Sequence, residues 1–455
     1  MTQRAPAHAE TAVAPDHWRP RYHVTGVRNW INDPNGPVHL DGRYHLFFQA
    51  NPQAPAWGPP HWGHVSSADL VHWTRHPTAL APSPGGPDAD GCWSGCLRVV
   101  DGRPAIYYTG VVGEDDDRVE SVCRAWGSPD LLTWSKEPEP LLAGPPPELG
   151  SGFHRDPFLW HDGSGWQLLL GSGTTAGERH GQVLRYDSPD GSRWRYRGVF
   201  FAAPRWAGGL DLGELWECPQ LVVSGSSVAL VVSCQVPGAP RPLTHAAGFV
   251  GSIHDGRFQG EPAGILDQGD AFYAPAVTTD AAGRTLLWGW AQEAVQPSTQ
   301  ATMGQVGALT VPRQLTVVDG RLDQEPVAEL TALRRAELRP GDPPAEPVLE
   351  LAGSPDGDGW TVTDDVARLR VGAGPDGLAV EVADPIGGER SFTLRRPAGA
   401  PVRVFVDGSL VEVFSGGAAL TTRTYWARPR VRLSASRRGD LQAWQLDAGG
   451  PRSAE

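Results

Sequence analysis

The sequence contains two interleaved series of repeats, and they constrain the fold more than any other feature. The pattern S-x-D-x-x-x-W begins at Ser67, Ser128 and Ser188, and a degraded copy, SIHDGRF, begins at Ser252. The second series consists of strand–turn–strand segments, each starting at an anchor: Asp33, Ser94, Asp156, Glu217 or Tyr273. Both series advance by about 60 residues, which favours a repeat architecture over a β-sandwich with coincidental spacing.

Each repeat has room for roughly four short strands. Asp-Gly, Ser-Gly or Ala-Gly pairs mark turns inside the segments, and Val, Leu, Tyr and Trp fill their flanks. A unit of about 60 residues with four strands has the size of a propeller blade. We therefore predict an all-β protein in which residues 20–322 form a five-bladed β-propeller.

The region after the repeats has a different character. Gln324–Pro340 is predicted to form a short helix, within a linker over residues 323–340. From 341 to 448 the sequence alternates between apolar and polar residues, as in VRVFVDGSLVEVF, with turn signals about every ten residues. This pattern predicts a C-terminal antiparallel β-sandwich.

Composition excludes several function classes. A net charge of −13 argues against a nucleic-acid or anionic-membrane partner. The single lysine, Lys136, excludes a P-loop and disfavours Schiff-base chemistry, and five cysteines without a C-x-x-C pair argue against a zinc site. No apolar run reaches the roughly 18 residues of a membrane span, and the first 20 residues lack an apolar core, so we expect a cytoplasmic location.

Three of the five anchors are carboxylates: Asp33, Asp156 and Glu217. Equivalent positions in successive blades lie on one ring, so these side chains should meet at one mouth of the central channel. A proline follows each acid directly or after one residue, and we expect the strands to begin at the acids because proline lacks the N–H that a ladder needs.

Two converging carboxylates suit glycoside hydrolysis, in which one attacks the anomeric carbon and the other is the acid/base. Trp216 and Cys218 flank Glu217, and apolar surroundings should favour its protonated form, which suits a general acid. The amides of Asn32 and Asn35 should hold Asp33 ionised as the nucleophile.

A metal site and a set of surface turns are the alternatives for the three acids. Carboxylates are ligands for calcium or magnesium, but no Asp-x-Asp-x-Asp loop surrounds these residues. Asp-Pro and Asn-Gly pairs also occur in surface turns, although three acids at blade spacing favour a shared site. We predict no metal site.

The motifs around the acids resemble those of a known family. Residues 30–36, WINDPNG, closely resemble the W-M-N-D-P-N-G signature of glycoside hydrolase family 32, with Ile31 in place of methionine. Arg155-Asp156-Pro157 and Glu217-Cys218-Pro219 are similar to its R-D-P and E-C-P motifs. The resemblance extends from about Tyr22 to Leu446. The family contains invertases, inulinases, levanases and sucrose-6-phosphate hydrolases.

The resemblance implies a five-bladed propeller followed by a sandwich, and an enzyme that cleaves terminal β-fructofuranosyl bonds of sucrose, fructo-oligosaccharides or fructans without a cofactor. Asp33 would be the nucleophile, Glu217 the acid/base, and Asp156 would grip fructose hydroxyls. The fructose pocket would be lined by Asn32, Gln49, Trp57, Trp93, Ser94, Arg155, Tyr273 and Trp290. A fructosyltransferase with the same residues and a carbohydrate-binding protein without activity remain alternatives.

Overall fold

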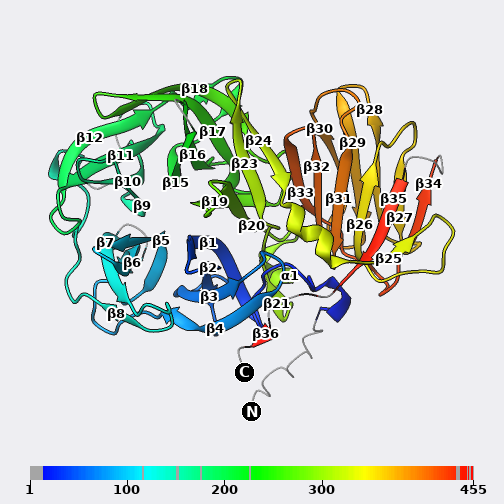
Figure 1. Ribbon diagram of the computed structural model, residues 1–455, viewed down its shortest axis with the longest axis horizontal. Helices are drawn as coiled ribbons and strands as arrows, with labels where there is room; N and C mark the ends of the chain where they lie inside the picture. Colours follow the sequence, from blue (N-terminus) through cyan, green and yellow to red (C-terminus); the bar gives the residue numbers. More distant parts are fainter. Residues whose placement is uncertain are drawn as a thin grey trace, which may run out of the picture.

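The structure is a computed structural model that describes residues 14–114, 117–149, 153–174, 177–224, 227–436, 441–447, 449 and 452–453. The described chain is built mainly from β-strands. Figure 1 shows two parts: five sheets surround a common centre in the first, blue to yellow-green part, and two further sheets lie side by side in the second, yellow to red part.

The five sheets of the first part follow the chain in order. The first sheet contains β21 (Gln305–Val306), β1 (Asn29–Leu40), β2 (Arg43–Asn51), β3 (His61–Ser67), β4 (Trp73–Leu80) and β36 (Arg452–Ser453). The second contains β5 (Gly91–Val100), β6 (Arg103–Val112), β7 (Val119–Gly127) and β8 (Trp134–Lys136). The third contains β9 (Arg155–His161), β10 (Trp166–Gly173), β11 (Gly181–Ser188) and β12 (Arg195–Ala202).

A short hairpin, β13 (Trp206–Ala207) with β14 (Leu210–Asp211), precedes the fourth sheet. That sheet contains β15 (Leu215–Ser224), β16 (Ser227–Gln235), β17 (Leu243–His254) and β18 (Arg257–Ile265). The fifth contains β19 (Phe272–Thr279), β20 (Thr285–Ala291), β22 (Ala308–Leu309), β23 (Arg313–Val318) and β24 (Arg321–Pro326). The described helical segments are short: η1 (Asp16–Trp18), η3 (Pro147–Leu149), α1 (Pro297–Gln300) and η4 (Ala328–Leu333).

The second part consists of two sheets. One contains β25 (Arg334–Leu338), β35 (Leu441–Leu446), β26 (Val348–Gly353), β31 (Val402–Asp407), β32 (Leu410–Ser415) and β33 (Ala418–Arg423). The other contains β30 (Gly388–Leu394), β29 (Gly377–Asp384), β28 (Arg368–Gly374), β27 (Trp360–Thr363) and β34 (Arg432–Ala435). Buried side chains of both sheets form one apolar cluster, so the sheets pack face to face.

The repeated S-x-D-x-x-x-W pattern forms the turn between the third and fourth strands of the first three sheets. In each copy the serine hydroxyl donates to the aspartate two residues later, and that aspartate accepts backbone N–H groups of the turn, at Ser67–Asp69, Ser128–Asp130 and Ser188–Asp190. The next residue is left-handed in every copy, with φ of 65°, 60° and 71° at Leu70, Leu131 and Gly191. The sequence period is therefore a period of hydrogen-bonded turns.

Apolar clusters fill the spaces between neighbouring sheets. The largest joins the third, fourth and fifth sheets around Trp216, and others join the second sheet to the first around Trp62 and to the third around Tyr107. These three side chains are completely buried. Truncating one such aromatic residue to alanine would cost about 3–5 kcal/mol, so these clusters hold the sheets in fixed relative positions.

The first strands of the five sheets, β1, β5, β9, β15 and β19, contact one another in sequence, and β19 contacts β1. Each carries one anchor of the second repeat, and in each the pairing register shifts at or directly after the anchor. The expectation that strands begin at the acids is wrong for β1 and β15, which start four and two residues earlier. A β-bulge accommodates the proline inside the strand instead.

The prediction of one helix over Gln324–Pro340 is also wrong. Strand β24 continues to Pro326, the 3₁₀-helix η4 occupies only Ala328–Leu333, and β25 then joins a sheet of the second part. The apolar residues Leu330 and Leu333 are three positions apart and both buried, a spacing that suits one 3₁₀ turn as well as an α-helix.

Buried charges connect the two parts. Arg313 of β23 donates to Asp267 at 2.9 Å and to Glu412 of β32 at 2.6 Å. His23 places its ring nitrogens 2.7 Å from Asp407 and 2.9 Å from Glu412. Burial lowers the pKa of His23, but its hydrogen bonds to the two carboxylates raise the pKa by more. The net result is a pKa above the ordinary value.

All five cysteines are buried and free. Within the described ranges, no helix has the length and apolar character required to cross a membrane.

Candidate active site

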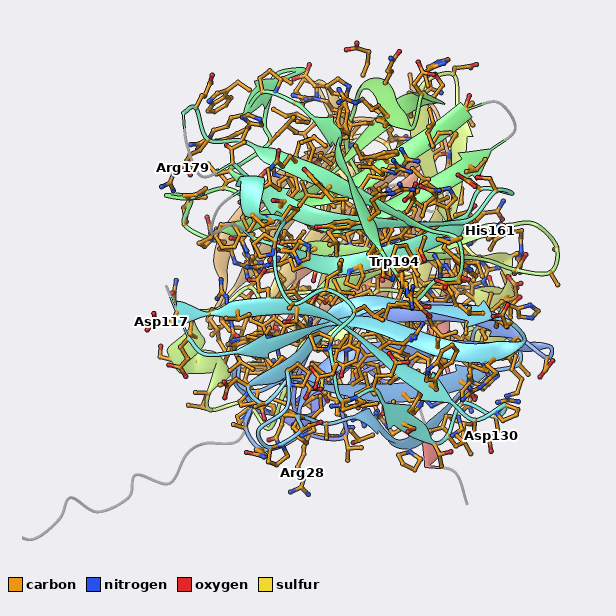
Figure 2. The ribbon with its side chains drawn as sticks, turned by 90° about the vertical axis from the view of Figure 1, so that its left-hand side faces the viewer. Arg28, Asp117, Asp130, His161, Arg179 and Trp194 are labelled. Carbon is orange, nitrogen blue, oxygen red and sulfur yellow. The ribbon has the colours of Figure 1, made fainter. Side chains whose placement is uncertain are left out.

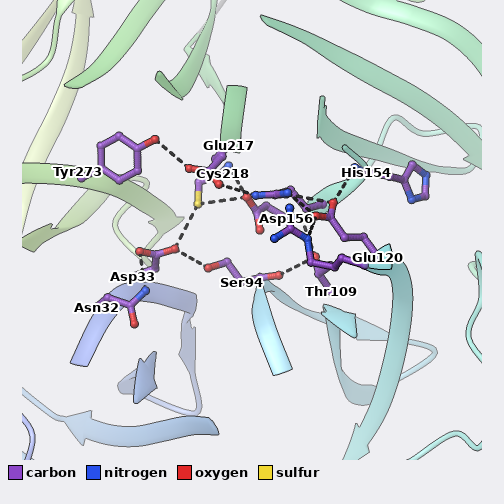
Figure 3. A network of polar contacts seen from close by, with 12 residues as sticks. Asn32, Asp33, Ser94, Thr109, Glu120, His154, Asp156, Glu217, Cys218 and Tyr273 are labelled. Atoms are coloured by element: carbon purple, nitrogen blue, oxygen red, sulfur yellow. Dashed lines mark hydrogen bonds and ion pairs between the residues drawn. The ribbon is translucent and has the colours of Figure 1, made fainter. Parts of the chain in front are cut away.

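The three acids of the repeat come together at the centre of the five sheets (Figure 3). Asp33 lies on β1, Asp156 on β9 and Glu217 on β15. The Sγ atom of Cys218 lies between two of them, 3.7 Å from Oδ2 of Asp33 and 3.6 Å from Oδ2 of Asp156. Residues that are far apart in the chain thus share one small site.

A ring of hydrogen bonds holds Asp33. The amide of Asn32 donates to Oδ1 of Asp33 and to Oε1 of Gln49, both at 3.1 Å. Gln49 donates to the hydroxyl of Ser94, which donates to Oδ2 of Asp33 at 2.6 Å. Trp30 fixes Asn32 with a 3.0 Å bond to its Oδ1. Both oxygens of Asp33 therefore accept a hydrogen bond, and the side chain has a defined orientation.

Burial raises the pKa of Asp33 to about 6, and the hydrogen bond from Ser94 opposes that rise. The negative charge of Glu217 raises the pKa of Asp33, whereas the hydrogen bond from Asn32 lowers it. Asp33 is thus mostly ionised at neutral pH. The predicted contribution of Asn35 is wrong, since its buried amide has no hydrogen-bond partner within the described part of the chain.

Glu217 is held by two side chains from other sheets. Arg155 donates to its Oε1 and the hydroxyl of Tyr273 donates to its Oε2, both at 2.9 Å. The expectation that apolar neighbours surround Glu217 is wrong for Trp216. Neighbouring strand residues point to opposite faces, so Trp216 faces the other side of the strand, where its indole N–H donates to the carbonyl oxygen of Leu212.

Asp156 occupies an exceptional backbone position, with φ of 61°. Its N–H donates to the hydroxyl of Thr109 at 2.8 Å, and its Oδ2 accepts the N–H of Cys218 at 2.9 Å. Burial raises the pKa of Asp156 well above its usual range, and the charge of Glu217 adds to that rise while Arg155 opposes it. The site therefore holds a carboxyl group that binds protons near neutral pH.

Two glycines of β10 bring the third and fourth sheets close enough to share this site. A Cβ atom on Gly171 would lie 2.3 Å from the carbonyl oxygen of Trp216 and 3.2 Å from Cα of Glu217. A Cβ on Gly173 would lie 2.2 Å from the carbonyl oxygen of Glu214. Side chains at these positions would push β15, and Glu217 with it, away from Arg155 and Asp156.

Aromatic residues surround the acids. The half-exposed ring of Trp57 meets Trp93 edge to face with centroids 5.7 Å apart, and the Arg155 guanidinium lies 5.0 Å from the Trp93 ring. Trp290 is buried and packs edge to face on Trp30 at 5.6 Å. Trp57 thus exposes its ring at the rim next to Trp93, whereas Trp290 is buried against Trp30.

The strand order shows at which end of the sheets the acids lie. Figure 2 views the five-sheet part from the side and shows Asp117 and Arg179 at one end of the sheets and Asp130 and His161 at the other. Strand β9 starts at Arg155 and ends at His161, so the acids lie at the end marked by Asp117 and Arg179.

All eleven residues predicted for the site lie on the strands or loops at this end, whereas the contacts expected from Asn35 and Trp216 are absent there. Sequence reasoning missed Glu120, which lies on the third strand of the second sheet and contacts Arg155. Its only signal was an acidic residue in the strand VESVCRAW, which also contains Arg124. Among the described residues, no group of three His, Cys, Asp or Glu side chains could hold a metal ion.

Comparison with known proteins identifies what the chain resembles. Residues 23–326 match the family model described as the glycosyl hydrolases family 32 N-terminal domain. The sucrose-6-phosphate hydrolase of Escherichia coli is 31% identical over an alignment of 464 positions that covers 93% of this chain and 94% of that enzyme. The sucrose-6-phosphate hydrolase of Zymomonas mobilis is 34% identical over 335 residues, 70% of this chain and 64% of that enzyme.

Among solved structures, a family 32 β-fructofuranosidase from Bombyx mori superposes with a TM-score of 0.81. It is 27% identical, and the match covers 97% of each chain. The family predicted from the three motifs is therefore confirmed.

Proposed function

The chain belongs to glycoside hydrolase family 32 and is a glycoside hydrolase of the β-fructofuranosidase type; from this premise we propose that it releases terminal β-D-fructofuranosyl groups with retention of configuration. The substrate class we propose is sucrose and short fructo-oligosaccharides. The observation that carries the proposal is the pair Asp33 and Glu217, two carboxylates on β1 and β15 with separate sets of hydrogen-bond partners.

In the first step, an oxygen of Asp33 attacks the anomeric carbon of the fructosyl group, and Glu217 gives its proton to the departing glycosidic oxygen. A covalent fructosyl ester of Asp33 results, and the leaving sugar departs as a neutral alcohol. In the second step Glu217 accepts a proton from water, the water oxygen attacks the same carbon, and Asp33 leaves as a carboxylate.

The surroundings of each acid support these roles. Ser94 and Asn32 donate to Asp33 and favour its ionised form, which both attack and departure require. Arg155 and Tyr273 orient Glu217 toward one side of the site. The oxygen of Asp156 that Cys218 does not contact is available to bind fructose hydroxyl groups.

The same family assignment supports the finer description of the fold. We propose that the five sheets are the blades of a five-bladed propeller over residues 20–322, and that the second part, residues 341–448, is a β-sandwich domain. The first strands of the five sheets contact one another in a closed ring, which supports five blades around one axis.

The test is product analysis with sucrose, 1-kestose, inulin and levan, resolved by chromatography. Asp33→Asn should abolish turnover, whereas the matched control Asp101→Asn, in the turn between β5 and β6 at the opposite end of its sheet, should retain it. Free fructose is the expected product, first appearing as the β-furanose by NMR. First appearance of the α-anomer would refute double displacement, longer fructans would indicate a transferase, and no turnover of any substrate would refute the proposed activity.

A further inference from the structure

Arg155 is the cation bonded to Glu217, and Glu120 holds Arg155 in place on its other side. Its Nε donates to Oε2 of Glu120 at 3.0 Å, and its Nη2 donates to Oε1 of the same carboxylate. The remaining nitrogen, Nη1, donates to Glu217 at 2.9 Å. The side chain is 4% exposed, so the two-pronged contact with Glu120 sets the plane of the guanidinium and aims Nη1.

Glu120 is itself held rigidly. Its Oε2 also accepts the backbone N–H of His154 at 2.9 Å, and its Oε1 accepts Nε of Arg118 at 3.1 Å. Burial raises the pKa of Glu120, but the Arg155 guanidinium lowers the pKa below its ordinary value. The ionised form of Glu120 is thus favoured.

Glu217 is the group whose proton depends on this arrangement. The titratable groups that face it come from four strands: Asp33 of β1, Arg155 and Asp156 of β9, Cys218 of β15 and Tyr273 of β19. Arg155 is the single cation in this set. The negative charge of Glu120, on the other side of the guanidinium, offsets part of its positive charge.

We propose that Glu120 is a positioning residue of the hydrolytic site: it aims Arg155 at Glu217 and offsets its charge, so that Glu217 keeps the proton that the leaving oxygen needs. This inference rests on the proposed role of Glu217 as the general acid. Glu120 does not touch the reacting atoms and acts only through Arg155.

The first test is Glu120→Gln, which keeps the size of the side chain but removes its charge and one acceptor of the fork. The acid form of Glu217 should then be less favoured. The alkaline limb of the kcat/KM profile with sucrose should move to lower pH by about one unit, with a fall of up to about tenfold in kcat/KM at pH 8. Glu120→Asp keeps the charge, so its alkaline limb should stay near the wild-type position even though kcat falls.

Glu350→Gln is the matched control for loss of a buried ion pair. Glu350 is fully buried in the second part and accepts a two-pronged contact from Arg334 at 2.6 and 2.7 Å. This variant should lose thermal stability and keep the wild-type pH profile. If Glu120→Gln does not fold, Arg118→Met provides a second test. It removes a positive charge that contacts Glu120, so the negative charge of Glu120 offsets more of the charge of Arg155 and the alkaline limb should move to higher pH.

An active Glu120→Gln variant with the wild-type alkaline limb would overturn the inference, and so would an equal shift in Glu120→Asp. If only Arg118→Met folds, an unchanged or lowered limb overturns it. Failure of the proposed function looks different, because the wild-type enzyme itself would then not hydrolyse the fructoside.

Discussion

The hydrogen bond from Ser94 to Asp33 provides a quantitative test of the proposed nucleophile. Its length of 2.6 Å and its charged acceptor place it among strong hydrogen bonds, which contribute about 1.5–3 kcal/mol. Ser94→Ala removes a donor that favours the carboxylate over the acid. Since 1.36 kcal/mol corresponds to about one pKa unit, the pKa of Asp33 should rise from about 6 by about 1–2 units.

The assay is the pH dependence of kcat/KM for sucrose between about pH 4 and 9. The acid limb, which reports ionisation of the nucleophile, should move to higher pH by about 1–2 units. A loss of fructose contacts with Ser94 would instead lower kcat/KM by the same factor at every pH. The shift of the limb therefore separates the two effects.

Ser67→Ala is the control for this variant. Ser67 is also buried and donates to a carboxylate, that of Asp69, but it lies in the turn before β4 and outside the site. It should lower the Tm without moving the profile. Ser94→Ala should also lower the Tm, because Gln49 loses its acceptor. An unchanged acid limb in a folded Ser94→Ala enzyme would refute the assignment of that limb to Asp33.

Three further predictions follow from the buried charges and the rim. Asp33→Asn should raise the Tm at pH 7.5, because the raised pKa of Asp33 means that its ionised form destabilises the fold by about 1–3 kcal/mol. The gain in Tm should vanish near pH 4, where Asp33 is protonated. An equal gain at both pH values would contradict this. His23→Gln should reduce the loss of Tm between pH 6.5 and 9. The raised pKa of His23 means that its contacts with Asp407 and Glu412 contribute stability that is complete below pH 6.5 and is lost as pH rises. An equal loss of Tm over this range in the variant and the wild type, measured by thermal unfolding, would refute it. Trp57→Ala should raise the KM for sucrose about fivefold and leave the Tm unchanged; an unaltered KM in steady-state kinetics would exclude a sugar contact at this rim residue.

The sequence was sufficient to group the three acids because the repeat is set by local chemistry. The turn aspartates Asp69, Asp130 and Asp190 accept backbone N–H groups within their own turns, so their spacing reports the spacing of the sheets. Once the sheets are aligned, the anchors on their first strands must share one end. The family motifs are the basis of the roles proposed for Asp33 and Glu217.

The partners of the acids were less accessible to sequence reasoning. Glu217 was expected to depend on its chain neighbours, but β-strand geometry turns Trp216 away, and its partners Arg155 and Tyr273 come from adjacent sheets. Glu120 lies two strands away from the centre and reaches the site only through Arg155. Such contacts depend on the distance between sheets, which no local pattern in the sequence encodes.

The most direct test of the central claim is identification of the residue that carries the fructosyl group. Glu217→Gln should be mixed with a fructoside whose leaving group needs no protonation, quenched in acid and examined by mass spectrometry. The intermediate should accumulate because water is no longer activated. We predict one added anhydrohexose on the peptide that contains Asp33, and none on Asp33→Asn. An adduct on Asp156, or turnover without any adduct in rapid-quench samples, would contradict the account.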